Sequence, residues 1–269
     1  MPASRKPAAR SAGCATREAA GLLKLGGWAA FLALVAASVW VVGPDPARLA
    51  AGLPRLAGWL ATAWPPDFSN PGDIARRAAE TVGIATLGTL LAAILAAPIA
   101  LLAARPVTRA ALLRQPARGA LDALRGVDGF VFALIFVAAV GLGPFAGMIG
   151  VALHSAGSLG KLWSEAFEAA DPRTAEAILA VGGTRLQVAR LALIPQTLPE
   201  TAGALFYVWE FNIRASTVLG LVGAGGIGQE LKNAVDLLDF NRLFAILLVV
   251  VGLTLAADRI SAALRRSLA

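Results

Sequence analysis

The 269-residue sequence has very little of the chemistry on which metal proteins and many soluble enzymes depend. It contains one cysteine, Cys14, and one histidine, His154, so it predicts neither a disulfide framework nor a Cys/His metal site. A single histidine also argues against histidine-based acid–base catalysis. We therefore expect no catalytic residue, no metal site and no cofactor.

Charged residues are scarce as well. They make up 15% of the chain, and hydrophobic residues make up 57%. Soluble globular chains have about 25% charged and roughly 45–50% apolar residues. The composition therefore predicts an integral membrane protein rather than a soluble enzyme.

Long stretches without charge mark candidate transmembrane helices, each of which needs about 20 mostly apolar residues. The stretch 129–160 is too long for one span, because it would extend about 48 Å at ~1.5 Å per residue. The turn residues Gly141-Leu142-Gly143-Pro144 divide it in two. The sequence thus predicts an all-α membrane protein with about six spans, at residues 26–43, 81–104, 122–141, 144–163, 201–222 and 243–257.

The segments around these spans complete the expected organisation. Prolines, tryptophans and scattered charges predict a loop before the second span. We expect a disordered basic cytoplasmic tail at 1–20, the first transmembrane helix at 21–43, an external loop at 44–78, a core with five spans at 79–260, and a cytoplasmic tail at 261–269.

Basic residues are distributed unevenly along the chain. With the N-terminus inside, 17 of the 24 Lys and Arg residues fall on the cytoplasmic side of the predicted spans. This asymmetry follows the positive-inside rule and predicts that both termini are cytoplasmic. Membrane orientation accounts for the net charge of +7, so nucleic-acid binding is not needed to explain it.

The polar loop at 165–195 contains the most informative motif. Glu176-Ala177-Ile178 is followed by three residues, then Gly182, then nine residues and Ala192-Leu193-Ile194-Pro195. Asp171-Pro172 predicts a helix start just before the motif, and Gly182-Gly183 allows a sharp turn out of that helix. Such a helix could dock on another protein or lie on the membrane surface.

The spacing resembles the EAA loop of binding-protein-dependent ABC importer permeases, in which Glu-Ala-Ala, three residues, Gly, nine residues and Ile-x-Leu-Pro dock on the ATPase. The chain departs from that pattern at Ile178, Ala192 and Ile194. The stretches FNIRASTVLGLVGAGGIGQEL and FVAAVGLGPFAGMIGVALHSAG look like the permease of phosphonate-type importers specifically. The resemblance covers about residues 75–260.

This resemblance implies a type I, MetI-like permease in the bacterial inner membrane that carries phosphonate or a related phosphorus oxyanion. It also implies a homodimer, two copies of a separate ATPase and a periplasmic substrate-binding protein. The chain has no G-x-x-x-x-G-K-[ST] motif, so ATP hydrolysis is expected in the partner. The residues expected to couple to the ATPase are Glu176, Ala177, Ile178, Gly182, Gly183, Ile194 and Pro195.

The fifth predicted span contains two charged residues. Glu210 and Arg214 are four residues apart in the favourable order for a helical ion pair, and unpaired charges in a membrane are costly. Either they pair to hold the span against its neighbours, or Arg214 lines the translocation path with Asn212, Ser216 and Thr217. His154 is expected to be a packed or wall-lining polar residue, because its neighbour Ser155 points about 100° away on a helix.

Other interpretations carry less weight. The G-x-G-x-x-G at 223–228 predicts a turn near the outer surface, because no acid ends a following strand as a dinucleotide fold requires. Gly143, Gly147, Ala93 and Ala97 allow close helix packing, within the subunit or between copies. The remaining alternatives are a permease for another solute, a stand-alone secondary transporter and a membrane-embedded hydrolase.

Overall fold

The computed structural model describes residues 12–268, and all regular structure in that range is helical. The chain divides into two units, Met1–Gly58 and Trp59–Ala269. The first contains α1 (Ala12–Val42) and most of α2 (Pro46–Thr62). Most of the predicted N-terminal tail lies outside the described residues, and the predicted first span, except for Gly43, falls within α1.

The region 44–78, predicted as an external loop, is largely helical. It contains α2, and α3 begins at Pro71, ten residues before the predicted second span. Residues 26–42 and α2 bend by 53° at their junction, and the two together pass as one broken span by length and hydropathy.

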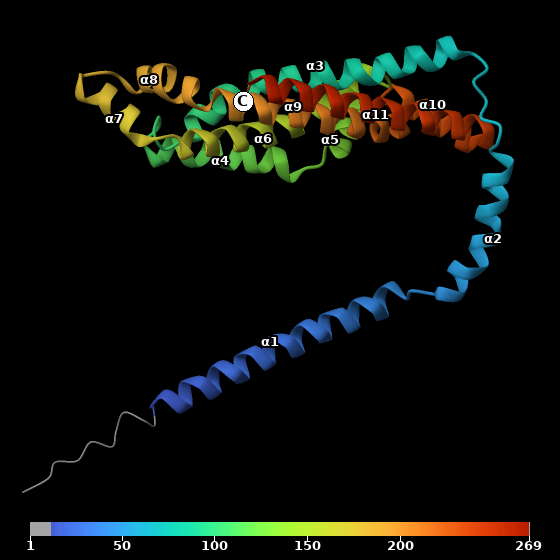
Figure 1. Cartoon of the computed structure of the whole chain (residues 1–269), viewed down its shortest axis with the longest axis horizontal. Helices are drawn as coiled ribbons and strands as arrows, with labels where there is room; N and C mark the ends of the chain where they lie inside the picture. Colours follow the sequence, from blue (N-terminus) through green and yellow to red (C-terminus); the bar gives the residue numbers. More distant parts are fainter. Residues whose placement is uncertain (1–11, 269) are drawn as a thin grey trace, which may run out of the picture. The chain divides into compact units, whose positions relative to one another are not determined.

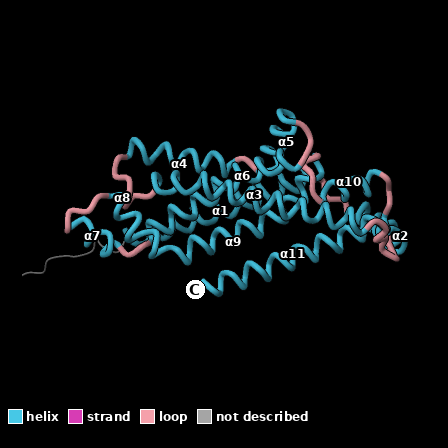
Figure 2. Tube along the Cα trace, turned by 90° about the horizontal axis from the view of Figure 1, so that it is seen from above, coloured by secondary structure: helices cyan, strands magenta, loops and turns pink. Residues whose placement is uncertain are grey.

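The second unit is a helical bundle (Figure 1). α3 (Pro71–Ala103) packs mainly on α6 (Pro144–Ala169), and α9 (Ile194–Leu219) packs on both. α11 (Phe240–Leu268) packs on α9. α7 (Pro172–Ala180) and α8 (Arg185–Val188) lie at one end of the bundle, and α10 (Ile227–Asp236) lies at the other (Figures 1 and 2).

Small residues let these helices approach closely. A Cβ added to Gly157 would lie 2.5 Å from the Arg125 nitrogen, and one on Gly150 would lie 2.7 Å from the Ala133 nitrogen. A Cβ on Gly147 would lie 2.9 Å from the Ala224 oxygen. Glycine at these positions therefore serves packing inside the subunit, where lipid-exposed helices rely on close contact rather than on the hydrophobic effect.

The predicted third span, 122–141, is broken in the structure. α4 (Ala111–Gly126) and α5 (Gly129–Val140) meet at an angle of 84°. The helix is interrupted at Asp128, because the Asp128 Oδ1 accepts the Phe130 N–H at 2.8 Å and caps the start of α5. α5 is about 18 Å long, too short to cross a bilayer. The split between the third and fourth spans falls at Gly141-Leu142-Gly143, as the turn residues predict.

Among the residues that the structure describes, two single helices, α3 and α11, are long and apolar enough to cross a membrane. α6 and α9 are each about 39 Å long, which is sufficient length, but they carry more polar residues. The count of six spans remains a prediction. The range 261–269, predicted as a tail, continues α11 as far as Leu268, and buried Ser261 donates to the Phe206 carbonyl at 3.2 Å.

Candidate functional site

The loop 165–195 folds into α7, a glycine turn, α8 and a π-helical turn that leads directly into α9. Asp171 caps α7 by accepting the Arg173 N–H at 2.9 Å, and Pro172 is its first residue. Gly182 adopts a backbone φ of +85°, a conformation that residues other than glycine adopt only with strain. A Cβ on Gly183 would lie 2.6 Å from the Ile178 oxygen.

Buried contacts fix this loop to the end of the bundle. Val188 and Leu193 pack in one core cluster with Ala100, Phe167 and Ala175. The loop is also tied to the segment after α3, because the side chain of Arg185 donates to the Pro106 carbonyl at 2.9 Å. The loop and the start of α9 are thus held as one body against α3 and α6.

The outward side of the same loop is exposed and partly apolar. Glu176 and Ala177 are exposed, and Ile178 is half-buried. Beside Gly182, the side chain of Val181 is 86% exposed, and Leu186 on α8 is 72% exposed. Ile194 and Pro195 are also exposed at the start of α9. Exposed apolar side chains around a tight turn form a surface suited to a partner protein.

A cavity of about 450 Å³ lies between the bend at Asp128, α6 and α9. Among the polar residues predicted for the translocation path, Arg214 and His154 line this cavity and are partly exposed. His154 Nδ1 lies 2.9 Å from the Val127 carbonyl oxygen, which holds the ring against the bend. Phe130 and Phe211 contribute apolar wall, so the site is an apolar chamber that also contains a cation, an imidazole and the carboxylate of Asp128.

Glu210 and Arg214 form the predicted ion pair, with Arg214 Nη2 3.0 Å from Glu210 Oε1. The Glu210 side chain is 7% exposed and the Arg214 side chain is 50% exposed. The pair therefore joins a buried carboxylate to a guanidinium that faces the cavity.

The other polar residues of the fifth predicted span are buried. Asn212 accepts the Ser155 hydroxyl at 3.0 Å and donates to the Thr89 hydroxyl at 2.8 Å, which links α9, α6 and α3. The hydroxyls of Ser216 and Thr217 donate to carbonyls of their own helix. These bonds tie the three side chains to the protein, and Asn212 also lines the 450 Å³ cavity.

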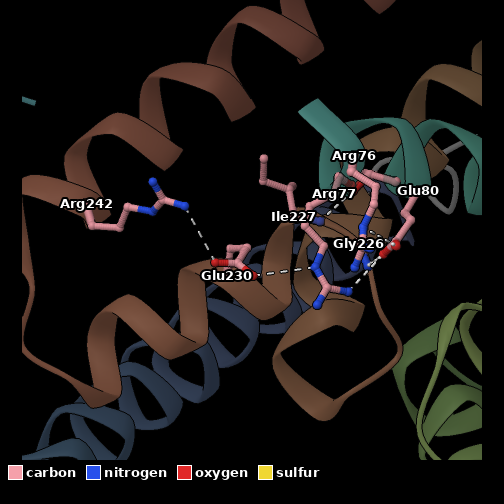
Figure 3. A network of polar contacts seen from close by, with 8 residues as sticks. Arg76, Arg77, Glu80, Gly226, Ile227, Glu230 and Arg242 are labelled. Atoms are coloured by element: carbon pink, nitrogen blue, oxygen red, sulfur yellow. Dashed lines mark hydrogen bonds and ion pairs between the residues drawn. The ribbon is translucent and has the colours of Figure 1, made fainter. Parts of the chain in front are cut away.

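At the far end of the bundle, ion pairs join α3, α10 and α11 (Figure 3). Arg77 lies 3.0 Å from Glu80 and 3.5 Å from Glu230, and Glu230 is 4.0 Å from Arg242. Glu80 also accepts the Gly226 N–H at 3.3 Å. This outer network holds the first turn of α10 through side chains whose pairing is not visible in the sequence.

The segment before α3 is attached to the same end. Asn241 donates to the Pro65 carbonyl at 2.7 Å, and Arg242 donates to the Ser69 carbonyl. The Ser69 N–H and hydroxyl both bond Asp67 at 2.8 Å and lower the pKa of its carboxyl below the ordinary value of 3.8. Asp67 is therefore ionised at neutral pH.

The glycine-rich stretch 223–228 forms a turn between α9 and α10, as predicted. Gly223, Gly225 and Gly226 have φ values of +83°, +79° and +74°. A helix, α9, precedes the glycines where a dinucleotide-binding unit would have a strand. A Cβ on Gly228 would lie 1.8 Å from the Thr217 oxygen, so this glycine is needed for close packing.

Three residues of the site were not identified from the sequence. Val181 and Leu186 carry the exposed apolar surface of the loop, and Arg265 lies 3.7 Å from Glu210. Two features of the sequence could have indicated the first two residues. Val181 is an apolar residue beside the turn glycine Gly182, and Leu186 is an apolar residue in the polar interval 183–191. Nothing in the local sequence indicates the third, because its partner lies on another helix.

The family profile described as "Binding-protein-dependent transport system inner membrane component" matches residues 96–269. A putative phosphite transport system permease protein of Stutzerimonas stutzeri, HtxC, is 44% identical over 87% of this chain and 83% of its own. The phosphite transport system permease protein PtxC of the same organism is 39% identical over 90% and 89%. A phosphate-import permease of Mycolicibacterium smegmatis is 38% identical over 76% of this chain and 38% of its own.

Among solved structures, an inward-facing form of the MetNI methionine ABC transporter superposes with a TM-score of 0.66 at 19% identity. The match covers 75% of this chain and 99% of that one. An amino acid ABC transporter matches with a TM-score of 0.60 at 17% identity. These matches show the MetI-like fold. The chain therefore belongs to the family of inner-membrane components of binding-protein-dependent transport systems, and it is a multi-pass membrane protein.

Proposed function

We propose that this chain is the permease subunit of an ATP-driven importer for a phosphorus oxyanion such as phosphite or a phosphonate. Support comes from relatives named for phosphite transport, which align over most of both chains. The methionine transporter shares the fold at 19% identity, so the fold alone does not choose the cargo. A permease for another small solute and a stand-alone secondary transporter are the alternatives.

In this proposal the exposed surface of loop 165–195 binds an ATPase subunit on the cytoplasmic face. The single observation that carries the assignment is the exposed apolar pair Val181 and Leu186 beside the Gly182 turn. Glu176, Ala177 and Ile178 lie on the helix that precedes that turn. An apolar surface of this kind needs a partner when it faces water.

The same loop would transmit the movement of the ATPase into the bundle. The π-helical turn Ala189–Leu193 connects α8 to α9 without a flexible linker, and α9 carries Glu210 and Arg214. A displacement of α7 and α8 therefore reaches the wall of the 450 Å³ cavity through one helix. Arg214 and His154 would line the translocation path there.

The assembly follows from the same proposal. Two permease copies, two ATPase subunits and an external substrate-binding protein would form the importer. Stutzerimonas stutzeri has permeases named HtxC and HtxE, so a pair of different permeases is the alternative to a homodimer. Native mass spectrometry of the purified complex would distinguish one permease mass from two.

The orientation also belongs to the proposal: α7 and α8 are cytoplasmic, and the α10–α11 turn is external. Cys14 is the only cysteine, so a Cys14→Ser background is free of native thiols. We expect a cysteine at exposed Val181 to react with a membrane-impermeant thiol reagent only in inverted vesicles. A cysteine at exposed Leu237 should react only in right-side-out vesicles. The reverse pattern would refute the proposed coupling role.

The functional test uses a charge at the centre of the exposed surface. Val181→Glu should abolish ATPase copurification and uptake without loss of folded permease, because that side chain is 86% exposed. Leu237→Glu is the matched control, since Leu237 is 78% exposed and directly follows α10, the helix at the opposite end of the bundle (Figure 1). Unchanged copurification with Val181→Glu would contradict the docking surface, and a wild-type chain that copurifies no ATPase would contradict the importer.

A further inference from the structure

Glu210 contacts a second arginine, from the end of α11. Arg265 Nη2 lies 3.7 Å from Glu210 Oε2, and Arg214 Nη2 occupies the other carboxylate oxygen at 3.0 Å. The side chains of Arg214 and Arg265 are 50% and 36% exposed, whereas that of Glu210 is 7% exposed. One buried carboxylate thus holds two partly exposed guanidiniums, and the group carries a surplus of one positive charge.

This three-residue cluster lies beside the middle of α3. Leu264, next to Arg265, lines a cavity of about 280 Å³ with Thr89 and Leu90 of α3. Those two residues fall inside the uncharged stretch 81–104 of α3, a helix that meets the requirements of a span. The C-terminal end of α11 accordingly lies beside the bundle and short of the end formed by α7 and α8 (Figures 1 and 2).

A guanidinium beside the middle of a membrane-spanning helix is unfavourable against lipid, which favours a position against other protein or a water-filled space. Arg214 also lines the 450 Å³ cavity, together with Asp128, so one guanidinium of the cluster opens on that chamber. Guanidinium groups donate in a planar fork that matches oxyanions. The surplus positive charge would lower the barrier to an anion that passes through.

We propose that Arg265 and Arg214 together contact the oxyanion cargo as it crosses the permease, and that Glu210 is a positioning residue that holds both arginines. This inference rests on the proposed function and assigns a cargo contact to the end of α11. Asp258, two turns earlier on α11, makes no ion pair within the described residues and lies about 10 Å along the helix from Arg265. It therefore does not neutralise Arg265.

The test uses the complete transporter, with its ATPase and binding protein, in proteoliposomes and labelled phosphite as the probe. Arg265→Gln should lower the maximal uptake rate about tenfold, the effect of losing one charge-assisted contact. The half-saturating concentration should not change, because capture occurs on the binding protein. Arg265→Lys should retain more activity than Arg265→Gln. Arg266→Gln, at an exposed neighbour with no ion pair in the described chain, should stay within about twofold of wild type.

A double variant separates cargo contact from charge balance. If Arg265 only neutralises Glu210, Glu210→Gln combined with Arg265→Gln should restore uptake. If Arg265 contacts the anion, uptake in the double variant should stay below that of Glu210→Gln alone while ATPase copurification is normal. Restored uptake, or wild-type uptake by Arg265→Gln, would overturn the inference. A wild-type complex that transports no phosphorus oxyanion would instead refute the proposed function.

Discussion

Replacing Asn212 by leucine should destabilise the bundle while leaving the translocation chemistry intact. Asn212 is 1% exposed, and its side chain joins Ser155 on α6 to Thr89 on α3 with bonds of 3.0 and 2.8 Å. Leucine removes both bonds at similar side-chain size. Interhelical hydrogen bonds in membranes contribute about 0.6 kcal/mol each on average, and up to roughly 1.7.

Partial compensation limits the loss. Thr89 already donates to the Ala85 carbonyl at 2.6 Å, and the Ser155 hydroxyl can turn to a carbonyl of its own helix. We therefore expect Asn212→Leu to lower the free energy of unfolding by about 1–2 kcal/mol. The corresponding fall in the thermal midpoint is roughly 2–8 °C for a domain of this size.

The assay is thermal unfolding of the purified permease in detergent, alongside uptake by the complete transporter at a temperature where both variants are folded. Ser216→Ala is the control, because the Ser216 hydroxyl bonds only the Asn212 carbonyl of its own helix. An unchanged midpoint together with a large loss of uptake would refute the structural role and place Asn212 in the path.

Three further predictions concern packing, the outer network and the coupling turn. Gly150→Leu should destabilise the permease by about 1–3 kcal/mol in thermal unfolding, because a Cβ there meets the Ala133 nitrogen at 2.7 Å. Gly83→Ala, with no atom within 4 Å of its Cβ, should be neutral or stabilising. Glu80→Ala should speed hydrogen exchange in residues 224–230, since it frees the Gly226 N–H, and unchanged exchange would argue against the network. Gly182→Val should reduce uptake and ATPase copurification, because it imposes about 1–2 kcal/mol of strain at φ +85°. Wild-type values for that variant would show that the turn is not required.

The periodic and compositional features of the fold were readable from the sequence. The uncharged stretches located α3 and most of α6, and the apolar stretch around Glu210 and Arg214 located most of α9. The glycines at 141–143 marked the break before α6. The Asp171-Pro172 start of α7 and the Glu210–Arg214 pair were also predicted, because both depend on residues within one helical turn of each other. The EAA-type spacing indicated the family that the comparisons confirm.

Features that depend on contacts between distant helices were decided by the tertiary structure. The 84° break at Asp128 lies in a stretch that reads as one continuous span, and α11 continues through residues predicted as a tail. The burial of Asn212 depends on Ser155 and Thr89, which are 57 and 123 residues away. Local sequence sets helix propensity and charge, but it does not specify which helices pack against each other. Only packing brings Arg265 to Glu210 and turns an i,i+4 pair into a cationic cluster.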